Sequence, residues 1–581
     1  MTQTTRTVNS AGVNLTVHER GDAAAPTIIL VHGYPDTSAV WNEVASRLEA
    51  RFHVVTYDVR GAGESDAPKR TADYDLSLLA ADLQAVADAV SPGRRVHLVA
   101  HDWGSIQTWE SVTTAGAEQR FASYTTVSGP SLDHVGFWMR DKSQRSTRQL
   151  VRQGRKSWYI AAFHTPVAPV LWRTVLSKTF APAIARMEGL PDAADYPSPT
   201  LGADGARGVK LYRANVRSSL RNPRERPTDV PVQLIIATKD RYVSPAIALS
   251  SKLWVSKLWV REVQTGHWLP RKAPDVMAQA VAEFVDYTEG GQEPRSLRRL
   301  RSGASSRAGA REFDDKLVVV TGAGSGIGRE TALAFAALGA TVVIADLNAA
   351  PAEATADLVR AQGVDAHAYV VDVSDVAAME DFVKRVVADH GVPDVVVNNA
   401  GIGIAGSFLD TTAADWERIV DVNLLGVVTG CRLFGQAMVD RREGGQIVNV
   451  ASAAAFTPSR ALGAYCATKA AVLMLSECLR AELADKGIGV SAICPGIVNT
   501  PITTSTHYVG ISDAEESDRR KRVSKQYALR NFPPSKVATA IVKAVRTNAA
   551  VVPVTPEARG ARFMSRLSPG AMRRFAQIDA L

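Results

Sequence analysis

Residues 96–105 read Val-His-Leu-Val-Ala-His-Asp-Trp-Gly-Ser, and residues 317–328 read Leu-Val-Val-Val-Thr-Gly-Ala-Gly-Ser-Gly-Ile-Gly. In each stretch a short apolar run, typical of a buried strand in a parallel sheet, leads through a turn into a helical pattern. The first turn presents Asp102 at its tip, whereas the second is rich in glycine. Ligands of such sheets bind at the carboxyl ends of the strands. The chain therefore carries two different α/β folds, each with its own site.

The length and composition agree with two domains. A chain of 581 residues is too long for one hydrophobic core, and 46% hydrophobic with 22% charged residues is typical of soluble globular protein. Residues 288–312 are rich in Arg, Gly, Ser and Ala and lack hydrophobic periodicity, which indicates a flexible basic linker. We expect one domain over residues 1–287 and another over residues 313–581.

Charge and cysteine usage restrict the partners and the compartment. The formal net charge is +8, but the arginines are concentrated in particular segments, so we expect no nucleic-acid partner. Four cysteines without framework-like spacing indicate reduced thiols, and we predict no metal site. The polar N-terminus and the lack of a long apolar run predict a cytoplasmic protein. Residues 559–575 alternate basic and apolar side chains, which fits either peripheral contact with a membrane or packing on the same domain or a neighbouring subunit.

An aspartate at the tip of a strand-to-helix turn restricts the chemistry of the first site. A carboxylate that attacks an ester makes an anhydride, whereas attack on a saturated carbon makes an ordinary ester. Hydrolysis of that ester needs a base to activate water and an acid to orient the base. His267 and Asp240 follow Asp102 in the expected chain order, Asp240 after an apolar run. Backbone N–H groups of Tyr34 and Trp103 are candidates for the oxyanion hole.

Residues 10–287 resemble the α/β-hydrolase superfamily, in its epoxide hydrolase branch. The resemblance rests on His-Gly-aromatic-Pro at residues 32–35, His-Asp-Trp-Gly at residues 101–104 and Gly-His-Trp at residues 266–268. Haloalkane dehalogenases of this fold also use an aspartate nucleophile, but they commonly carry Asn where this chain has Tyr34. One donor for a departing halide is therefore missing, although the alternative stays open.

The resemblance also implies a cap. Residues 131–226 interrupt the sheet pattern and look like the helical cap that closes such sites. Within it, Tyr159 and Tyr212 match the positions of the tyrosines that hold the epoxide oxygen in soluble epoxide hydrolases. Aromatic residues scattered through the cap fit an apolar, lipid-like substrate. We therefore expect an epoxide to be hydrolysed to a diol. In an alternative from another class, this half is a lipid-binding or membrane-docking module.

The second site begins with a cradle for a pyrophosphate. A strand, a glycine turn and a helix N-terminus bring backbone N–H groups and a positive dipole to the phosphates. Asp346 ends the next strand, where a carboxylate can hydrogen-bond the adenosine ribose and repels a 2′-phosphate. This favours NAD over NADP, although the neighbouring Arg329 leaves NADP possible. The turn supplies Gly322, Ser325, Gly326, Ile327 and Gly328.

Tyr465 and Lys469 are four residues apart in a helical pattern and so share one helix face. A nearby ammonium and a nicotinamide cation favour the tyrosine phenolate, which can then exchange a proton with an alcohol while hydride moves to or from the nicotinamide. Ser452, after an apolar run, is expected to hold the substrate oxygen. Asn423 is expected to complete a proton relay behind Lys469.

From residue 314 to the C-terminus the chain resembles the short-chain dehydrogenase/reductase family. The resemblance implies a Rossmann-type, doubly wound parallel sheet and assembly into homo-oligomers through this domain. It also implies five further positions at the cofactor: Asp372, Asn399, Pro495, Gly496 and Thr500. As a whole, the chain resembles bifunctional mycobacterial fusions of an epoxide hydrolase with a dehydrogenase. Either the two domains act in sequence, from epoxide to diol to ketone, or they act on different groups of one lipid.

Overall fold

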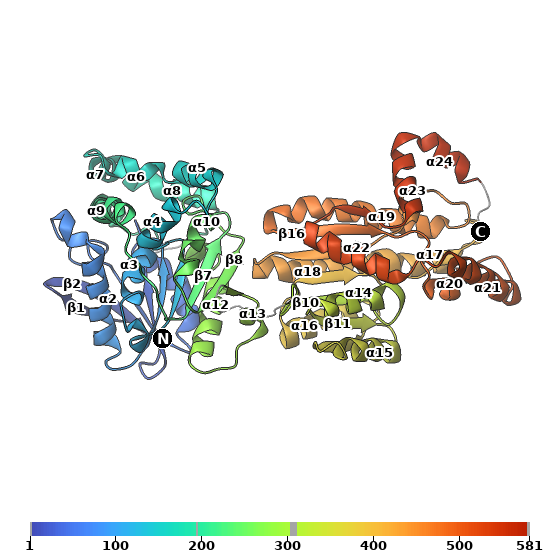
Figure 1. Cartoon of the computed structure of the whole chain (residues 1–581), viewed down its shortest axis with the longest axis horizontal. Coiled ribbons are helices and arrows are strands. Elements are labelled where there is room, and N and C mark those ends of the chain that lie inside the picture. The colour runs from blue at the N-terminus through green and yellow to red at the C-terminus, as the bar shows by residue number, and fades with distance from the viewer. Residues whose placement is uncertain (1–2, 193–195, 303–310, 578–581) are drawn as a thin grey trace. The chain divides into compact units, whose positions relative to one another are not determined.

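The computed structural model describes residues 3–192, 196–302 and 311–577, and it divides into two compact units, Met1–Ala308 and Gly309–Leu581 (Figure 1). Each unit has a central β-sheet flanked by helices, and both cores consist of buried Val, Ile, Leu and Ala side chains. The α/β fold class expected for both halves is confirmed. The apolar runs at residues 96–100 and 317–320 are interior strands, as their composition predicted.

The sheet of the first unit has nine strands in the order β1-β2-β4-β3-β5-β6-β7-β8-β9. Strands β3 to β8 are parallel, whereas β2 pairs antiparallel with β1 and β4. The strands are β1 (Thr4–Ser10), β2 (Val13–Arg20), β3 (Thr27–Val31), β4 (His53–Tyr57), β5 (Val96–His101), β6 (Phe121–Val127), β7 (Val232–Ala237), β8 (Leu258–Val263) and β9 (Arg301–Ser302). Because the parallel strands are covered on both faces, the residues of β3 to β7 are buried along their whole length.

Helices cover both faces of this sheet. Apolar side chains of α2 (Leu76–Val90) and α3 (Trp103–Val112) pack on one face, and those of α1 (Asn42–Leu48) and α12 (Pro274–Thr288) pack on the other. Two short helices, α10 (Pro245–Ala248) and α11 (Leu269–Lys272), follow β7 and β8. The arrangement leaves the carboxyl ends of β3, β5, β7 and β8 free to carry site residues.

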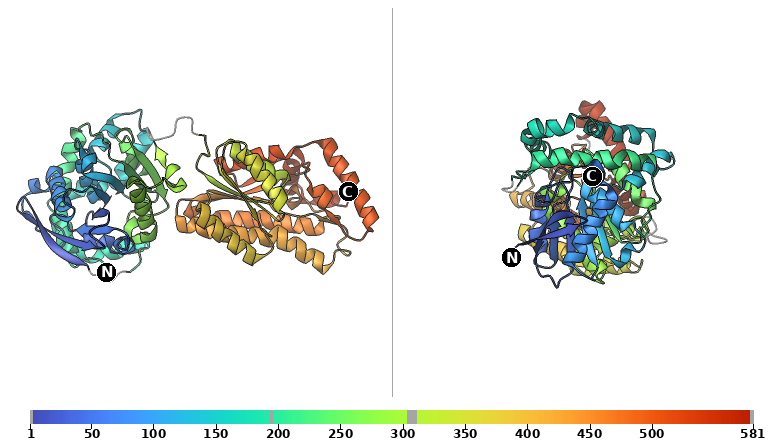
Figure 2. Two further views of the ribbon diagram at one scale, coloured as in Figure 1. Left: turned by 90° about the horizontal axis from the view of Figure 1, so that it is seen from below. Right: turned by 90° about the vertical axis from the view of Figure 1, so that its left-hand side faces the viewer.

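A helical insertion between β6 and β7 forms a layer of its own (Figure 2). Its elements are α4 (Leu132–Arg140), α5 (Thr147–Lys156), α6 (Trp158–Phe163), α7 (Ala168–Leu171), the π-helical turn η4 (Trp172–Leu176), α8 (Ser177–Glu188) and α9 (Leu201–Arg221). Side chains of α7, η4 and α9 pack against Tyr34 and Trp103, which follow β3 and β5. The insertion therefore lies over the carboxyl ends of the strands, where a cap is required.

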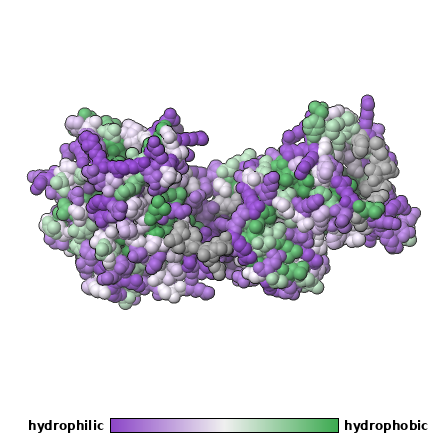
Figure 3. All heavy atoms as spheres, in the orientation of Figure 1, coloured by the Kyte–Doolittle hydropathy of each residue, from purple (hydrophilic) through white to green (hydrophobic). Residues whose placement is uncertain are grey.

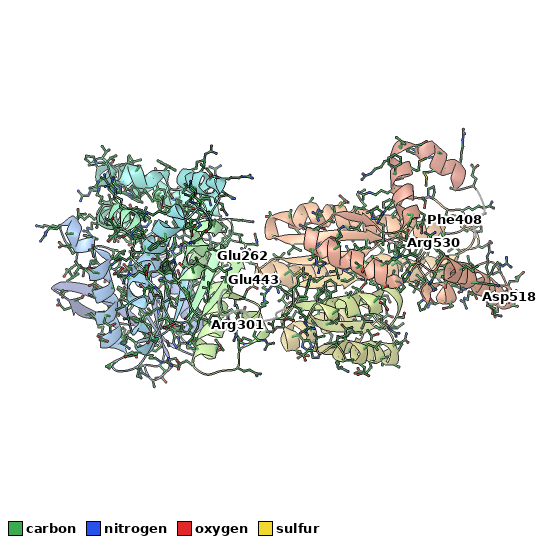
Figure 4. All side chains as sticks on the ribbon, in the orientation of Figure 1. Glu262, Arg301, Phe408, Glu443, Asp518 and Arg530 are labelled. Atoms are coloured by element: carbon green, nitrogen blue, oxygen red, sulfur yellow. The ribbon has the colours of Figure 1, made fainter. Side chains whose placement is uncertain are left out.

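The prediction of a flexible linker over residues 288–312 is wrong for the part of this segment that the structure describes before residue 303. Helix α13 (Arg295–Arg298) buries Leu297 against Trp259 and Phe284, and β9 continues the sheet beside β8. Arg301, labelled in Figure 4, forms an ion pair with Glu293 at 2.6 Å. One buried leucine and this pair hold a segment whose composition resembled a tether. Residues 303–310 lie outside the described residues.

The second unit has a seven-stranded sheet, all parallel, in the order β12-β11-β10-β13-β15-β16-β18. Its strands are β10 (Leu317–Thr321), β11 (Thr341–Asp346), β12 (Ala366–Val370), β13 (Val395–Asn398), β15 (Gly445–Val450), β16 (Ile488–Cys494) and β18 (Val551–Pro553). The strand order reverses between β10 and β13, and a crevice at such a point binds nucleotides in doubly wound folds. The predicted Rossmann-type sheet is confirmed.

Helices lie on both faces of this sheet as well. Helices α14 (Gly326–Ala337), α15 (Ala349–Arg360) and α22 (Pro534–Thr547) share one core cluster, and α16 (Val376–His390), α18 (Gly426–Arg441) and α19 (Gly463–Leu483) share the other. The remaining elements are α17 (Ala413–Val420), α20 (Ile502–Ser505), α21 (Asp513–Arg530), and a small sheet of β14 (Ile404–Ala405) with β17 (His507–Tyr508).

Two further helical features bear on membranes. Among the described residues, one stretch, 413–441, has the length and apolar composition to cross a membrane, but half of its most apolar window is buried. The basic C-terminal segment forms α23 (Pro556–Leu567) and α24 (Pro569–Phe575). Ala558 is buried, so α23 packs on its own unit, whereas Phe563 and Leu567 are exposed. Both interpretations of this segment therefore have a structural basis.

Two candidate active sites

Asp102 stands at the tip of a tight turn between β5 and α3. Its backbone has φ 51° and ψ −122°, an uncommon conformation for a residue with a side chain. The surrounding glycines make the turn possible: a Cβ on Gly129 would lie 2.0 Å from the Asp102 carbonyl oxygen, and one on Gly33 2.5 Å from the Asp102 Cβ. This turn exposes the carboxylate beyond the end of the strand, where a nucleophile can reach a substrate.

His267 lies between two carboxylates. Its Nδ1 donates to Asp240 Oδ2 at 2.9 Å, and its Nε2 is 3.5 Å from Asp102 Oδ2. The second oxygen of Asp240 accepts N–H groups of Tyr242 and Val243 at 2.6 and 2.9 Å. The structure thus brings together the three side chains that the sequence placed in order, and the backbone of the loop after β7 holds Asp240 in place.

The electrostatics of this trio follow from burial and charge. Burial disfavours the imidazolium, but Asp240 and Asp102 outweigh it and raise the pKa of His267 to about 10. Burial also disfavours the Asp240 carboxylate, yet His267 and the N–H donors lower its pKa. Both neighbouring acids therefore favour the protonated form of His267. Loss of either carboxylate charge makes His267 a stronger acid and its neutral form a more accessible base.

An oxyanion hole and a missed supporting residue complete the site. The Tyr34 backbone N–H donates to Asp102 Oδ1 at 2.8 Å, and Trp103 is the first residue of α3, whose N-terminus favours negative charge. His101 was not predicted. Burial lowers its pKa to about 4, and its neutral Nε2 donates to the His267 carbonyl oxygen at 2.9 Å. Its position next to Asp102 in the motif was the available signal.

A cavity of about 1320 Å³ opens over Asp102 and His267 and is also lined by Tyr159 and Tyr212. The two tyrosine rings meet edge to face, 6.0 Å between centroids. Burial raises the pKa of both phenols, so both are O–H donors at neutral pH. Apolar side chains from η4 and α8 line another part of the cavity. They are Trp172, Leu176 and Phe180.

The glycine turn of the second unit has the shape of a phosphate cradle. Gly322 and Gly326 have φ of 60° and 54°, and a Cβ on Gly328 would lie 2.2 Å from the Gly322 carbonyl oxygen. Ser325 caps α14, so Ile327 and Gly328 lie in its first turn. Side chains at the three glycines would fill the space over the helix N-terminus. The residues present therefore fit a dinucleotide pyrophosphate.

Asp346 and Asp372 lie at the adenosine side. Both line a cavity of about 630 Å³ together with Gly322. Asp346 accepts the Gly324 N–H at 2.8 Å, and Asp372 accepts the Ser374 N–H at 2.9 Å. Arg329 donates to the Gly324 carbonyl and to Thr355, so its guanidinium is engaged within the turn.

The other residues expected at the cofactor lie close to the glycine turn, and one of them, Asn399, is hydrogen-bonded to it. The side-chain amide of Asn399 donates to the carbonyl oxygens of Thr321 and Gly322, each at 3.0 Å, and thereby holds the glycine turn. Thr500 lies against the same turn, 3.3 Å from the position of a Cβ on Gly326. Pro495 and Gly496 directly follow β16.

Tyr465, Ser452, Lys469 and Asn423 gather at the carboxyl ends of β13 and β15. Tyr465 and Ser452 are hydrogen-bonded, and Lys469 Nζ donates to the Val450 carbonyl at 3.0 Å. Asn423 lies in a π-helical turn, η7 (Asp421–Leu425), a distortion often found at functional sites, and its side chain bonds the Ile402 backbone in both directions.

The expected phenolate of Tyr465 is not favoured by the protein side chains alone. Burial raises the pKa of Tyr465 to about 12, partly offset by the Ser452 hydrogen bond. Burial also lowers the pKa of Lys469 to about 8. The ammonium lies 5.8 Å from the centre of the tyrosine ring and donates to a carbonyl instead.

These two constellations define an α/β-hydrolase-fold domain followed by a short-chain dehydrogenase. The alpha/beta hydrolase fold family matches residues 26–272, and the short chain dehydrogenase family matches residues 316–508. "Probable oxidoreductase EphD" of Mycobacterium tuberculosis (strain H37Rv) is 46% identical over 594 residues, covering 100% of this chain and 99% of the relative. The chain belongs to this family of fused proteins, and it is an oxidoreductase joined to a hydrolase-fold domain.

Two shorter dehydrogenases each match less than half of this chain. Meso-2,3-butanediol dehydrogenase of Serratia marcescens is 38% identical over 192 residues, which are 33% of this chain and 74% of that enzyme. The crystal structure of a short-chain dehydrogenase/reductase from Burkholderia phymatum in complex with NAD is 29% identical and covers 46% of this chain and 99% of that one, with a TM-score of 0.42.

Proposed function

We propose that the chain is a bifunctional enzyme. The first unit hydrolyses an apolar epoxide to a diol through an ester on Asp102, and the second interconverts an alcohol and a ketone with NAD. The observation that carries the first part is the position of Tyr159 and Tyr212 in the same cavity as Asp102 and His267. Two phenol donors opposite a carboxylate nucleophile match the needs of an epoxide, whose oxygen must be protonated as the ring opens.

In the first half-reaction the Asp102 carboxylate attacks a ring carbon. The carbon–oxygen bond of the ring breaks, and the leaving alkoxide takes a proton from Tyr159 or Tyr212. The product is an ester of Asp102 that carries the new hydroxyl group. Ester formation removes one of the two negative charges beside His267, so the pKa of the imidazole falls. The imidazolium gives its proton, through solvent, to the tyrosinate that ring opening left, which restores the neutral tyrosine. The neutral His267 is then the base of the second half-reaction.

In the second half-reaction His267 deprotonates water, which attacks the carbonyl carbon of the ester. Negative charge develops on the carbonyl oxygen, next to the Tyr34 N–H that already donates to Asp102 Oδ1 at 2.8 Å. Collapse of the tetrahedral intermediate releases the diol and regenerates the carboxylate. Asp240 stabilises the imidazolium that forms during the attack.

A haloalkane dehalogenase is the main alternative, and one hydrogen bond weighs against it. The Tyr34 hydroxyl donates to the Gly205 carbonyl at 2.9 Å. This side chain is therefore engaged at a position where a departing halide would need a donor.

In the second unit, a bound NAD would supply the nicotinamide that takes or gives the hydride. The Gly322–Gly328 turn and the N-terminus of α14 would hold its pyrophosphate, and Asp346 would accept from the ribose hydroxyls and repel a 2′-phosphate. Tyr465 exchanges the proton of the substrate oxygen, which Ser452 orients. Since burial favours the neutral phenol, Tyr465 serves most readily as the proton donor in ketone reduction.

The two activities are separable by one substitution each. Asp102→Asn is expected to abolish diol formation and leave NAD-dependent turnover of an alcohol unchanged, whereas Tyr465→Phe is expected to do the reverse. If Asp102→Asn leaves diol formation unchanged, the hydrolase assignment is wrong and a lipid-binding or docking role for this unit gains support. Supply of epoxide and NAD to the unmodified chain tests the sequential reaction, because that hypothesis predicts a hydroxyketone.

A further inference from the structure

The cap of the first unit is its most cationic surface. Residues 139–188 contain ten Lys and Arg but two Asp and Glu, a formal charge of +8 that equals that of the whole chain. Among the described residues, none of these ten cations forms an ion pair with a carboxylate. On α5, Arg148, Arg152 and Arg155 recur at helical spacing on one face, and like charges at that spacing disfavour a helix.

The same surface exposes apolar side chains. Along α7 and η4, Val167, Val170, Leu171 and Val175 recur every three to four residues, and Val167 and Val170 are 63% and 58% exposed. Trp158 at the start of α6 is 70% exposed. Figure 3 shows hydrophobic atoms at the top of the hydrolase unit, over α6 to α8, beside hydrophilic atoms over α5. A contiguous apolar patch rimmed by cations marks an interaction surface.

The cavity over Asp102 opens onto this surface. Its lining includes Trp158 of the patch, two further exposed apolar side chains of the cap, Val151 and Met187, and three arginines of α5. These arginines are Arg148, Arg152 and Arg155. The cavity wall between this opening and Asp102 combines aromatic and aliphatic side chains, such as Trp158, Phe163 and Leu176, with polar ones, such as Lys156 and Thr238. The exposed apolar side chains and the nucleophile therefore line one cavity, which an apolar substrate can enter from this surface.

We propose that the cap docks the chain on an anionic lipid bilayer, so that apolar epoxides enter the Asp102 cavity directly from the membrane. The cations match anionic headgroups, and the apolar side chains between them match the acyl boundary. A second copy of this chain is disfavoured as the occupant, because it would bring the same positive face against this one. The entry of epoxides from the membrane rests on the proposed hydrolase function, whereas the docking of the cap does not.

Sedimentation of the full chain with vesicles tests the docking. We expect co-sedimentation with phosphatidylglycerol-containing vesicles and little with pure phosphatidylcholine. Arg173→Glu with Lys178→Glu is expected to weaken the partition at least about 25-fold, from about fivefold for each cation lost. Val170→Glu with Val175→Glu should also weaken the partition. None of these four side chains lines the cavity. Matched controls are Lys384→Glu with Lys543→Glu, and Leu358→Glu, at exposed helical positions of the second unit.

The outcomes separate the two proposals. Lost sedimentation in both cap variants, with hydrolysis of a water-soluble epoxide unchanged, supports the inference. Equal sedimentation of cap and control variants, no preference for anionic lipid, or a change of oligomeric state in the cap variants overturns it. Failure to hydrolyse any epoxide would contradict the proposed hydrolase function but not the docking, because sedimentation is measured without a substrate.

Discussion

Removal of the two cap phenols is the sharpest test of the epoxide assignment. Tyr212 is packed against Tyr34, Trp103 and Phe163, with ring centroids 5.4, 4.7 and 4.9 Å away, and Tyr159 packs on Phe163 at 5.5 Å. These contacts involve the rings, so phenylalanine at either position keeps the packing and removes the donor. Tyr159→Phe and Tyr212→Phe therefore change the chemistry of the cavity with little change of its shape.

The magnitude follows from the charge that the phenols stabilise. A hydrogen bond to a charged group contributes about 1.5–3 kcal/mol, which corresponds to about 10–150-fold in rate. We expect each single variant to slow ester formation on Asp102 within that range and the double variant to slow it more than either. Rapid mixing with quenching and mass spectrometry of the Asp102 peptide measures this step directly. A loss below about threefold in the double variant, or equal losses with a haloalkane, would refute the assignment of these tyrosines.

Two other predictions concern charge. Because the pKa of His267 in the folded protein, about 10, lies above its unfolded value of about 6.5, the stabilisation from its charge is complete below pH 6.5 and is lost as the pH rises toward 10. Asp102→Asn removes one of the carboxylates responsible, so urea denaturation at pH 7 and 9.5 should show a smaller loss of stability in that variant; an equal loss contradicts the charge account. Asp346→Ser should raise the ratio of kcat/KM for NADP over NAD by about tenfold or more, the effect of one partly screened charge. Asp365→Ser, an exposed acid before β12, is the matched control and should leave that ratio unchanged.

The parts of both sites that sequence could predict are those set by local backbone rules. An apolar run followed by a glycine-bearing turn fixes where a strand ends, and parallel strands present their carboxyl ends at one edge. Asp102 and Asp240 each follow an apolar run, and His267 was placed by the Gly-His-Trp motif at residues 266–268. Lys469 and Tyr465 lie at the same end of α19 and on one helix face because they are four residues apart.

Properties that depend on long-range packing were not predictable. Residues 295–302 read as a tether because one apolar side chain, Leu297, carries their attachment. The raised pKa of Tyr465 comes from burial by residues distant in sequence. Asn399 holds the glycine turn through two carbonyls that lie 77 and 78 residues earlier in the chain. The cap cations were noticed only as part of a net charge, because their common surface exists only once α5 to α8 are folded.

The covalent role of Asp102 is the central claim, and a single-turnover experiment in ¹⁸O-labelled water tests it most directly. With enzyme in excess over an epoxy fatty acid, the oxygen added to the first diol comes from the Asp102 carboxylate, because water attacks the carbonyl carbon of the ester. We predict an unlabelled diol and a labelled Asp102 peptide. A labelled diol with an unlabelled Asp102 would contradict the account, since water would then have opened the ring itself.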